Sequence, residues 1–371
     1  MASDVYSPGL FGVVAGETGV SSLGGGLRLR GYAIEELAEN ASFMEVAYLL
    51  LHEELPTSEE LADFLSILIE AEELPPLVSE LLERLPLHVD LMEILRSGVS
   101  LIGHFDLHAD GDDAGAHVVK TQRLLAVLPL LISYRWRLAN GLSRVQSDPQ
   151  LGFAANLFRL IHNREPSELE DRALDVTLTL HAEHELTPST FAARVVASTA
   201  TDYYSAITAA IGAAKGAFHG APNPEVIQTI QRAGDPESAR KWVLEALRSG
   251  QRIMGFGRRV QKSPDSRAEV LTPLCRQLAV ARGLEQFEAT ALAIELTLSE
   301  ELGILPNLIW PASRVFHYLQ FQPELYLPLF VVSRVTGWSA HIIEQLENNH
   351  VFRPRARYIG MSQRQVSRNR R

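Results

Sequence analysis

The hydrophobic positions of this chain recur mostly at the spacing of an α-helix. Thr57 followed by Glu60 is a capping-box pattern, which marks a helix N-terminus. The apolar residues that follow repeat every three or four positions: Leu61, Phe64, Leu65, Leu68 and Ile69. Ser167 with Glu170 repeats the capping signal before a helix that runs towards His181. Because helical periods separated by Pro and Gly continue almost to the C-terminus, the pattern predicts an almost all-α protein.

One stretch near the N-terminus departs from the helical spacing. Gly12 to Tyr32 is rich in Gly and Val, and Leu27-Arg28-Leu29-Arg30 alternates in the way a half-buried strand does. We therefore expect a short β-hairpin before the first helix. Sustained alternation does not recur in the sequence after residue 32.

Length and composition indicate a soluble protein of two domains. The 371 residues exceed the usual size of about 100 to 200 residues for one domain, and 46% of them are hydrophobic. The longest apolar stretch, Leu124 to Ile132, is interrupted by Pro129 and is well short of the roughly 20 residues that cross a membrane. The N-terminus carries no recognisable targeting signal, and Cys275 has no partner for a disulfide. We expect a cytoplasmic protein with no membrane partner.

The charge of the chain argues against nucleic acid as a partner. The net charge is −11, and Lys and Arg are scattered through acidic helices instead of forming one basic stripe. A small molecule that carries phosphate or carboxylate groups is compatible with this balance, because a local group of cations can hold it. The run at residues 253–268, IMGFGRRVQKSPDSRA, supplies such a group in Arg258, Arg259, Lys262 and Arg267.

Two histidine-containing runs are candidates for chemistry. HAEHE spans His181 to Glu185, and His219 lies in the run KGAFHGAPN. Three interpretations remain open for these histidines: metal ligands, buried structural residues, or polar contacts of a substrate. The spacing of His181 and His184 lacks the HExxH pattern of zinc sites, so contact with a substrate is the favoured interpretation. The segment from His104 to His117, with three His and four Asp, is either a metal site or a solvated loop.

The small residues between Ser205 and Gly216, SAITAAIGAAKG, predict a helix that approaches a neighbour closely. That neighbour is either another helix of the same chain or a second subunit.

Taken in order, these runs resemble the citrate synthase family. The resemblance covers nearly the whole chain, from GVVAGETGVSSL through LTLHAEHELTPSTFAARVVAS, YSAITAAIGAAKGAFHG and IMGFGRRVQK to SRVTGWSAHIIEQLENNHVFRPRARYIG. It implies a mainly helical homodimer that condenses acetyl-CoA with oxaloacetate and needs no cofactor or metal. It also implies a large domain, residues 1–220 with 320–371, and a small domain, residues 221–319, that close over the substrate.

The resemblance assigns roles residue by residue. His184 matches the histidine that binds oxaloacetate, and Arg267 and Arg334 match the arginines that clamp carboxylates. Arg353 matches an arginine that reaches the active site of the partner subunit, and His219 matches the histidine that donates a hydrogen bond to the thioester carbonyl. Planar guanidinium groups suit carboxylates because each can donate two parallel hydrogen bonds. Arg259 and Lys262 are the expected contacts of CoA.

Two positions depart from the pattern of the family. Where the family has GHRVY, this chain reads GRRVQ, so Arg258 replaces the histidine that polarises and protonates the oxaloacetate carbonyl. Where the family has PNVDFYSG, this chain reads PNLIWPAS, so Ile309 replaces the aspartate that deprotonates the acetyl methyl group. Arg hardly gives up a proton, because its pKa is above about 12, and Ile cannot accept one. No Asp or Glu lies between Leu302 and Gln322.

Three hypotheses follow for the function. The first is a citrate synthase-like protein that binds an oxaloacetate-type dicarboxylate and an acyl-CoA and retains at most weak condensing activity. The second is a non-catalytic protein that binds the same ligands, and the third is an enzyme with altered chemistry such as thioester hydrolysis.

Overall fold

The computed structural model describes residues 6–106, 113–257, 264–361 and 364. Within these residues the chain forms sixteen α-helices, three short strands and three 3-10 turns, so the expected all-α fold is confirmed. The elements are η1 (Pro8–Leu10), β1 (Ser21–Ser22), β2 (Arg28–Leu29), β3 (Tyr32–Ala33), α1 (Ile34–Asn40), α2 (Phe43–His52), α3 (Ser58–Glu70), α4 (Pro76–Arg84), α5 (Leu91–Ile102), η2 (Gly103–Phe105), α6 (Ala114–Ala139), α7 (Phe153–His162), α8 (Glu168–His181), α9 (Pro188–Ala197), α10 (Tyr203–Ala214), α11 (Pro224–Ala233), α12 (Pro236–Arg248), α13 (Ser266–Arg282), α14 (Glu285–Leu302), α15 (Ile309–Tyr318), η3 (Pro323–Leu325) and α16 (Tyr326–Glu347).

Side-chain capping fixes where several helices begin. Both predicted capping boxes are present, at Thr57 for α3 and at Ser167 for α8. In each, the hydroxyl accepts from the backbone of the third helical residue, whose carboxylate accepts from the cap in return. Ser42 and Glu45 form a third box at the start of α2, which the sequence analysis did not single out.

The strand region is a small antiparallel sheet rather than a single hairpin. Its order is β1-β2-β3, with Ser21 opposite Leu29 and Leu29 opposite Tyr32. Only Arg28 and Leu29 of the predicted alternating stretch are in a strand. Leu29 is fully buried while Arg28 is exposed, so the alternation correctly indicated which side faces the core.

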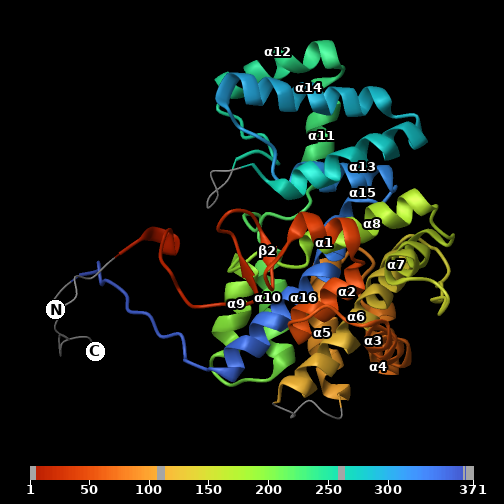
Figure 1. Cartoon of the computed structure of the whole chain (residues 1–371), viewed down its shortest axis with the longest axis vertical. Coiled ribbons are helices and arrows are strands. Elements are labelled where there is room, and N and C mark those ends of the chain that lie inside the picture. The colour runs from red at the N-terminus through yellow and green to blue at the C-terminus, as the bar shows by residue number, and fades with distance from the viewer. Residues whose placement is uncertain (1–5, 107–112, 258–263, 362–363, 365–371) are drawn as a thin grey trace, which may run out of the picture.

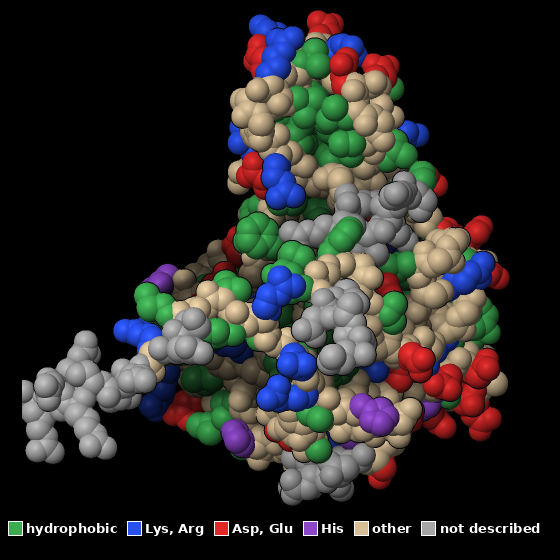
Figure 2. All heavy atoms as spheres, turned by 90° about the vertical axis from the view of Figure 1, so that its left-hand side faces the viewer, with side chains coloured by type: hydrophobic (Ala, Val, Ile, Leu, Met, Phe, Trp, Pro, Cys, Tyr) green, Lys and Arg blue, Asp and Glu red, His purple; other side chains and the backbone are tan. Residues whose placement is uncertain are grey.

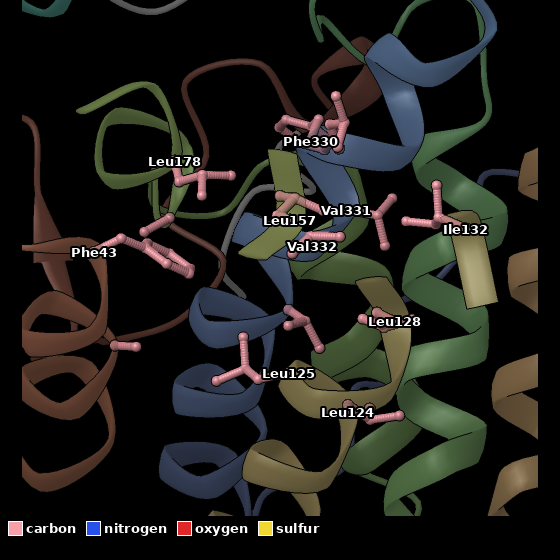
Figure 3. Close-up of a cluster of buried hydrophobic side chains, with 14 of the residues drawn as sticks. Phe43, Leu124, Leu125, Leu128, Ile132, Leu157, Leu178, Phe330, Val331 and Val332 are labelled. Atoms are coloured by element: carbon pink, nitrogen blue, oxygen red, sulfur yellow. The ribbon is translucent and has the colours of Figure 1, made fainter. Parts of the chain in front are cut away.

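Pro129 interrupts the longest apolar stretch of the sequence but does not end the helix that contains it. This helix, α6, is 26 residues long, and by length and composition alone it could cross a membrane. Its apolar window is 78% buried inside the protein, as in the core helix of a soluble protein. Leu124, Leu125 and Leu128 belong to the same buried hydrophobic cluster as Val331 and Val332 of α16 (Figure 3).

The buried hydrophobic side chains form two clusters. The larger one is built around α6 and α16 and takes in helices from both ends of the chain. The smaller one is built from α11, α12, α14, Ile253 and Trp310. Figure 1 shows α11, α12 and α14 together at one end of the molecule, with α13 and α15 between them and the remaining helices.

α10, the predicted small-residue helix, packs closely against its own chain on one face. It contacts α9, α5 and α16, and Ala206, Ala210 and Ala214 are buried there. Its other face carries Ser205 and Gly212, which are exposed. Charged side chains on the face in Figure 2 form several separate groups of both signs rather than one basic stripe.

Candidate active site

The candidate site is organised along one face of α16. Phe330, Arg334 and Trp338 are spaced four residues apart, so their side chains lie above one another on the same side of the helix. All three are buried. This face meets the C-terminal end of α8 and the loop that leads into α9.

Arg334 is a buried cation whose hydrogen-bonding capacity is only partly used. Its Nε donates to the backbone oxygen of His181 over 2.5 Å, and its guanidinium lies 4.8 Å from the ring centre of Phe330. Nη1 is buried and has no hydrogen-bond partner. Burial lowers the pKa of Arg334 to about 10, partly opposed by the charge of Glu183 and reinforced by that of Arg267. Arg334 is therefore still positively charged at neutral pH and has a donor to spare.

Arg267, in contrast, already holds a carboxylate. Its Nε and Nη2 donate to the two oxygens of Asp265, at 3.0 and 3.1 Å, in a nearly parallel pair. The Oδ2 atom of Asp265 also accepts from the backbone nitrogen of Leu308 over 3.2 Å. The start of α13 is thereby joined to the residue directly before Ile309.

His219 lies at the end of a hydrogen-bonded row that starts on α16. The indole N–H of Trp338 can only donate, so Ser189 Oγ accepts from it over 3.0 Å. Ser189 Oγ also lies 2.6 Å from Nε2 of His219 and 3.3 Å from the hydroxyl of Thr187. With the Ser189 hydroxyl as the donor to Nε2, the ring proton is on Nδ1, which is buried and has no hydrogen-bond partner. In this tautomer Nδ1 can donate to a ligand.

The electrostatic environment keeps His219 neutral. Burial lowers the pKa of His219 to about 4, and the positive charge of Arg334 acts in the same direction. Its ring also lies 5.5 Å from the ring of Phe330, which is the same ring that Arg334 covers. His219 and Arg334 thus share one wall of the site.

Ile309 is the first residue of α15 and lies beside the residue that follows His219. A Cβ atom placed on Gly220 would be 3.8 Å from Cδ1 of Ile309. Ile309 therefore presents an apolar methyl group to this part of the site.

The turn that precedes Arg258 is fastened to the same segment. Phe256 forms an isolated β-bridge with Pro306, and the side chain of Asn307 donates to the backbone oxygen of Gly257 over 3.1 Å. Gly255 adopts a φ of +91°, and a Cβ there would be 2.8 Å from that of Trp310, so only glycine fits. Arg258, Arg259 and Lys262 themselves lie outside the described residues.

A buried ion-pair network anchors α15. Arg314 is fully buried and pairs with Glu288 and with Glu295, each over 2.9 Å. Glu295 also accepts from the indole nitrogen of Trp310 over 2.7 Å. Because Trp310 directly follows Ile309, this network fixes the start of the helix.

Two further candidates occupy separate places. His184 is half-buried in the loop between α8 and α9. Arg353 is exposed on the C-terminal segment, which leads away from the body of the molecule (Figure 1), and it donates to the backbone oxygen of Pro354.

A metal site finds no support in the part of the chain that the structure describes. No group of three or more His, Cys, Asp or Glu residues there could hold a metal ion. His181 is buried, its Nδ1 is 2.8 Å from the backbone oxygen of Thr177, and burial lowers its pKa to about 3. It is a structural histidine. Most of the His- and Asp-rich segment, residues 107–112, lies outside the described residues.

Sequence reasoning missed several residues of this site. Ser189, Asp265 and Trp338 each stand within a run that was examined, but none was identified. An acidic residue two positions before a candidate arginine, as in Asp265-Ser266-Arg267, is a signal that could have found one of them. The partnership of Ser189 and Trp338 spans 149 residues and had no local signal.

Comparison with known proteins agrees with this geometry. A family profile described as "Citrate synthase, C-terminal domain" matches residues 9–355. The chain belongs to the citrate synthase family. It is 37% identical to the 2-methylcitrate synthase of Shewanella oneidensis, with 98% of each chain covered, and 38% identical to the citrate synthase of Mycolicibacterium smegmatis, with 96% of each covered.

Solved structures of the family share the fold over the whole chain. Citrate synthase from Pyrobaculum aerophilum superposes with a TM-score of 0.90 at 35% identity, covering 98% of this chain and 96% of that one. Citrate synthase from Thermoplasma acidophilum, solved as a ternary complex with carboxymethyl coenzyme A and oxaloacetate, superposes with a TM-score of 0.91 at 27% identity, with 98% of each chain covered. The citrate and 2-methylcitrate synthases are acyltransferases that condense an acyl-CoA with oxaloacetate.

The protonation of His219 is the first testable consequence. NMR of the ring nitrogens should show a neutral Nδ1–H tautomer that takes up a second proton only near pH 4. In Arg334→Met the pKa should rise towards its ordinary value of about 6.5, because a neighbouring positive charge that disfavours the imidazolium is gone. Arg240→Met, which removes an exposed arginine on α12, is the matched control and should leave the pKa of His219 unchanged. Titration of His219 near pH 6.5 in the native protein would contradict the proposed neutral, buried imidazole.

Proposed function

We propose that this protein binds an oxaloacetate-type dicarboxylate together with an acyl-CoA, and that it condenses them slowly if at all. The observation that supports binding is the buried, charged guanidinium of Arg334, whose Nη1 has no partner. A buried cation with a free donor is costly unless an anion meets it. A ligand carboxylate is the anion that fits a planar guanidinium best.

The proposed dicarboxylate cradle is made of His184, Arg267 and Arg334, with Arg353 supplied by the partner subunit. Arg267 is held in a fixed orientation by Asp265, so it loses little freedom when it binds. Its remaining donors and those of Arg334 would each contribute a charge-assisted hydrogen bond.

The proposed acyl-CoA site adjoins the cradle. The Nδ1–H of His219 would donate to the thioester oxygen, where negative charge develops if the acyl group becomes an enolate. Arg259 and Lys262 would bind the phosphates of CoA. The row from Trp338 through Ser189 would hold the imidazole in the required tautomer.

The missing base is the reason to expect slow condensation. Enolisation needs a proton acceptor beside the acyl carbon, and Ile309 offers only a methyl group there. Asp265 lies close by in space, but both of its oxygens already accept hydrogen bonds from Arg267, and one also accepts from Leu308. The carboxylate of Asp265 is therefore already engaged as a hydrogen-bond acceptor on both oxygens.

We further propose that residues 221–319 are a small domain that moves against a large domain of residues 1–220 and 320–371. The separate hydrophobic cluster of α11, α12, α14 and Trp310 supports a unit of this kind. A cytoplasmic location would suit Cys275, which is buried and unpaired.

Exposed hydrophobic side chains on the N-terminal and C-terminal segments support a homodimer. Large hydrophobic side chains are exposed on both terminal segments: Tyr6, Phe11 and Val14, then Val351, Tyr358, Ile359 and Met361, with Ile359 91% exposed. These segments meet one another, since Arg357 lies 4.8 Å from the ring centre of Tyr6. A second copy of the chain would cover this surface and the open face of α10.

Sedimentation tests the dimer directly. At micromolar concentration the native protein should sediment as a dimer, and Gly212→Arg should shift it towards a folded monomer. The reason is that Gly212 is exposed on α10 and a Cβ there meets nothing within 4 Å of its own chain. Gly24→Arg, at a loop position that is equally open within the chain, is the control. A native monomer would refute the proposal that Arg353 acts in a shared site.

Calorimetry tests the cradle. Citrate and oxaloacetate should bind the native protein, and Arg334→Met should weaken both by roughly ten- to a hundredfold, because each charge-assisted hydrogen bond contributes about 1.5 to 3 kcal/mol. Arg240→Met should bind as the native protein does. Absence of heat and of any thermal shift at millimolar ligand would mean that the cradle does not function.

The catalytic proposal predicts how restoring the family's residues changes the rate. Native protein should release thiol from acetyl-CoA in an oxaloacetate-dependent manner far below the enzyme median of about 10 s⁻¹. Ile309→Asp alone should help little, because the acid is still missing at residue 258. Ile309→Asp with Arg258→His should exceed either single change, since acid and base act in one concerted step.

The same assay separates the alternatives. Native turnover near the median would mean that another group supplies the base. Thiol release that does not depend on oxaloacetate would indicate thioester hydrolysis instead. Binding with no turnover at all would identify a non-catalytic protein that retains the ligands of its family.

A further inference from the structure

Glu183 is a fully buried carboxylate in the loop between α8 and α9, and the proposed site does not use it. Its Oε1 accepts from the hydroxyl of Ser21 over 3.0 Å and from Nε2 of His341 over 2.9 Å. Its Oε2 is buried and has no hydrogen-bond partner. Hydrogen bonds thus hold Oε1 in place, whereas Oε2 accepts none.

His341 is the hydrogen-bonded neighbour of this carboxylate on α16. Its Nε2 lies 2.9 Å from Glu183, and its Nδ1 lies 3.1 Å from Nη1 of Arg194. Arg194 in turn pairs with Glu344 over 2.5 Å.

The open oxygen of Glu183 lies against α16 close to Arg334. A Cβ on Gly337 would be 2.3 Å from Oε2 of Glu183, so the carboxylate rests on the helix one turn beyond Arg334. Burial opposes the charge of Glu183, yet His341, Arg334 and Ser21 together hold the pKa of its carboxyl below the ordinary value. Glu185 is half-buried and adds a second acidic group to the loop. Its backbone N–H donates a hydrogen bond to the hydroxyl oxygen of Ser21.

We infer that Glu183 is a built-in counterion of Arg334 that sets the affinity of the site for dianions. It attracts the guanidinium without forming a hydrogen bond to it, so Nη1 stays available for the ligand. A direct ion pair between Glu183 and Nη1 of Arg334 would block the donor that the ligand needs. Without any carboxylate nearby, Arg334 would be a lone buried cation in the ligand-free protein. This role rests on the proposed dicarboxylate site.

The role has a consequence that a merely structural residue would not produce. A fixed negative charge stabilises Arg334 in the free protein but repels an arriving dianion. Glu183→Gln keeps the shape and the acceptor for Ser21 and His341 while it removes the charge. It should therefore lower the melting temperature of the free protein and at the same time tighten citrate binding by about fivefold.

Calorimetry and thermal unfolding with citrate test this on the full-length protein. Ser21→Ala removes a hydrogen bond to Glu183 but no charge, so it should lower the melting temperature without tightening the affinity. Glu170→Gln removes a carboxylate from the buried pair with Arg164 and Arg282, and it should likewise leave affinity unchanged. If the native protein binds citrate and Glu183→Gln binds it equally or more weakly, the counterion role is overturned.

A double-mutant cycle of thermal stability, measured without ligand, separates this inference from the proposed function. Arg334→Met leaves the buried carboxylate of Glu183 without the positive charge of Arg334. Adding Glu183→Gln to that variant should therefore restore stability rather than lower it further. Additive losses in the free protein would overturn the inference whatever the ligand. Failure of the native protein to bind citrate, with the cycle non-additive, would reject the dicarboxylate site and keep the charge pair.

Discussion

The burial of one guanidinium in the middle of α16 is the constraint on which the rest of the site depends. Arg334 is placed in the larger hydrophobic core by the backbone oxygen of His181 and by the ring of Phe330. Such a charge is tolerated only where neighbouring groups compensate for lost water. The loop after α8, with its carbonyl and the carboxylate of Glu183, supplies that compensation, so the helix and the loop cannot be placed independently.

The same helix orients the group that would act on the acyl-CoA. Trp338, one turn beyond Arg334, holds Ser189, and Ser189 holds His219. Burial, reinforced by the positive charge of Arg334, lowers the pKa of His219 and keeps its imidazole neutral. In the proposed function, binding of an anion and polarisation of a carbonyl would both depend on residues of a single buried face of α16.

Sequence patterns predicted the elements whose signals are local. The capping boxes at Thr57 and Ser167 mark helices because both partners lie within one turn. Pro129 is accommodated inside α6 because the packing of α6 against α16 outweighs the hydrogen bond that proline removes. Positions such as Arg334 and His219 could be named from resemblance, whereas Ser189 and Glu183 could not, because their roles depend on contacts that span from 30 to 162 residues.

In the proposed assignment, the two departures from the family pattern act in the same electrostatic direction. Ile309 in place of an aspartate would remove one negative charge, and Arg258 in place of a neutral histidine would add one positive charge. Both changes occur in segments that the bridge between Phe256 and Pro306 and the side chain of Asn307 fasten together. A site with more positive charge stabilises a bound dianion in its ground state, while the groups that move protons in the transition state are missing. Since catalysis requires stronger binding of the transition state than of the ground state, this pairing favours retention of carboxylate ligands over their turnover.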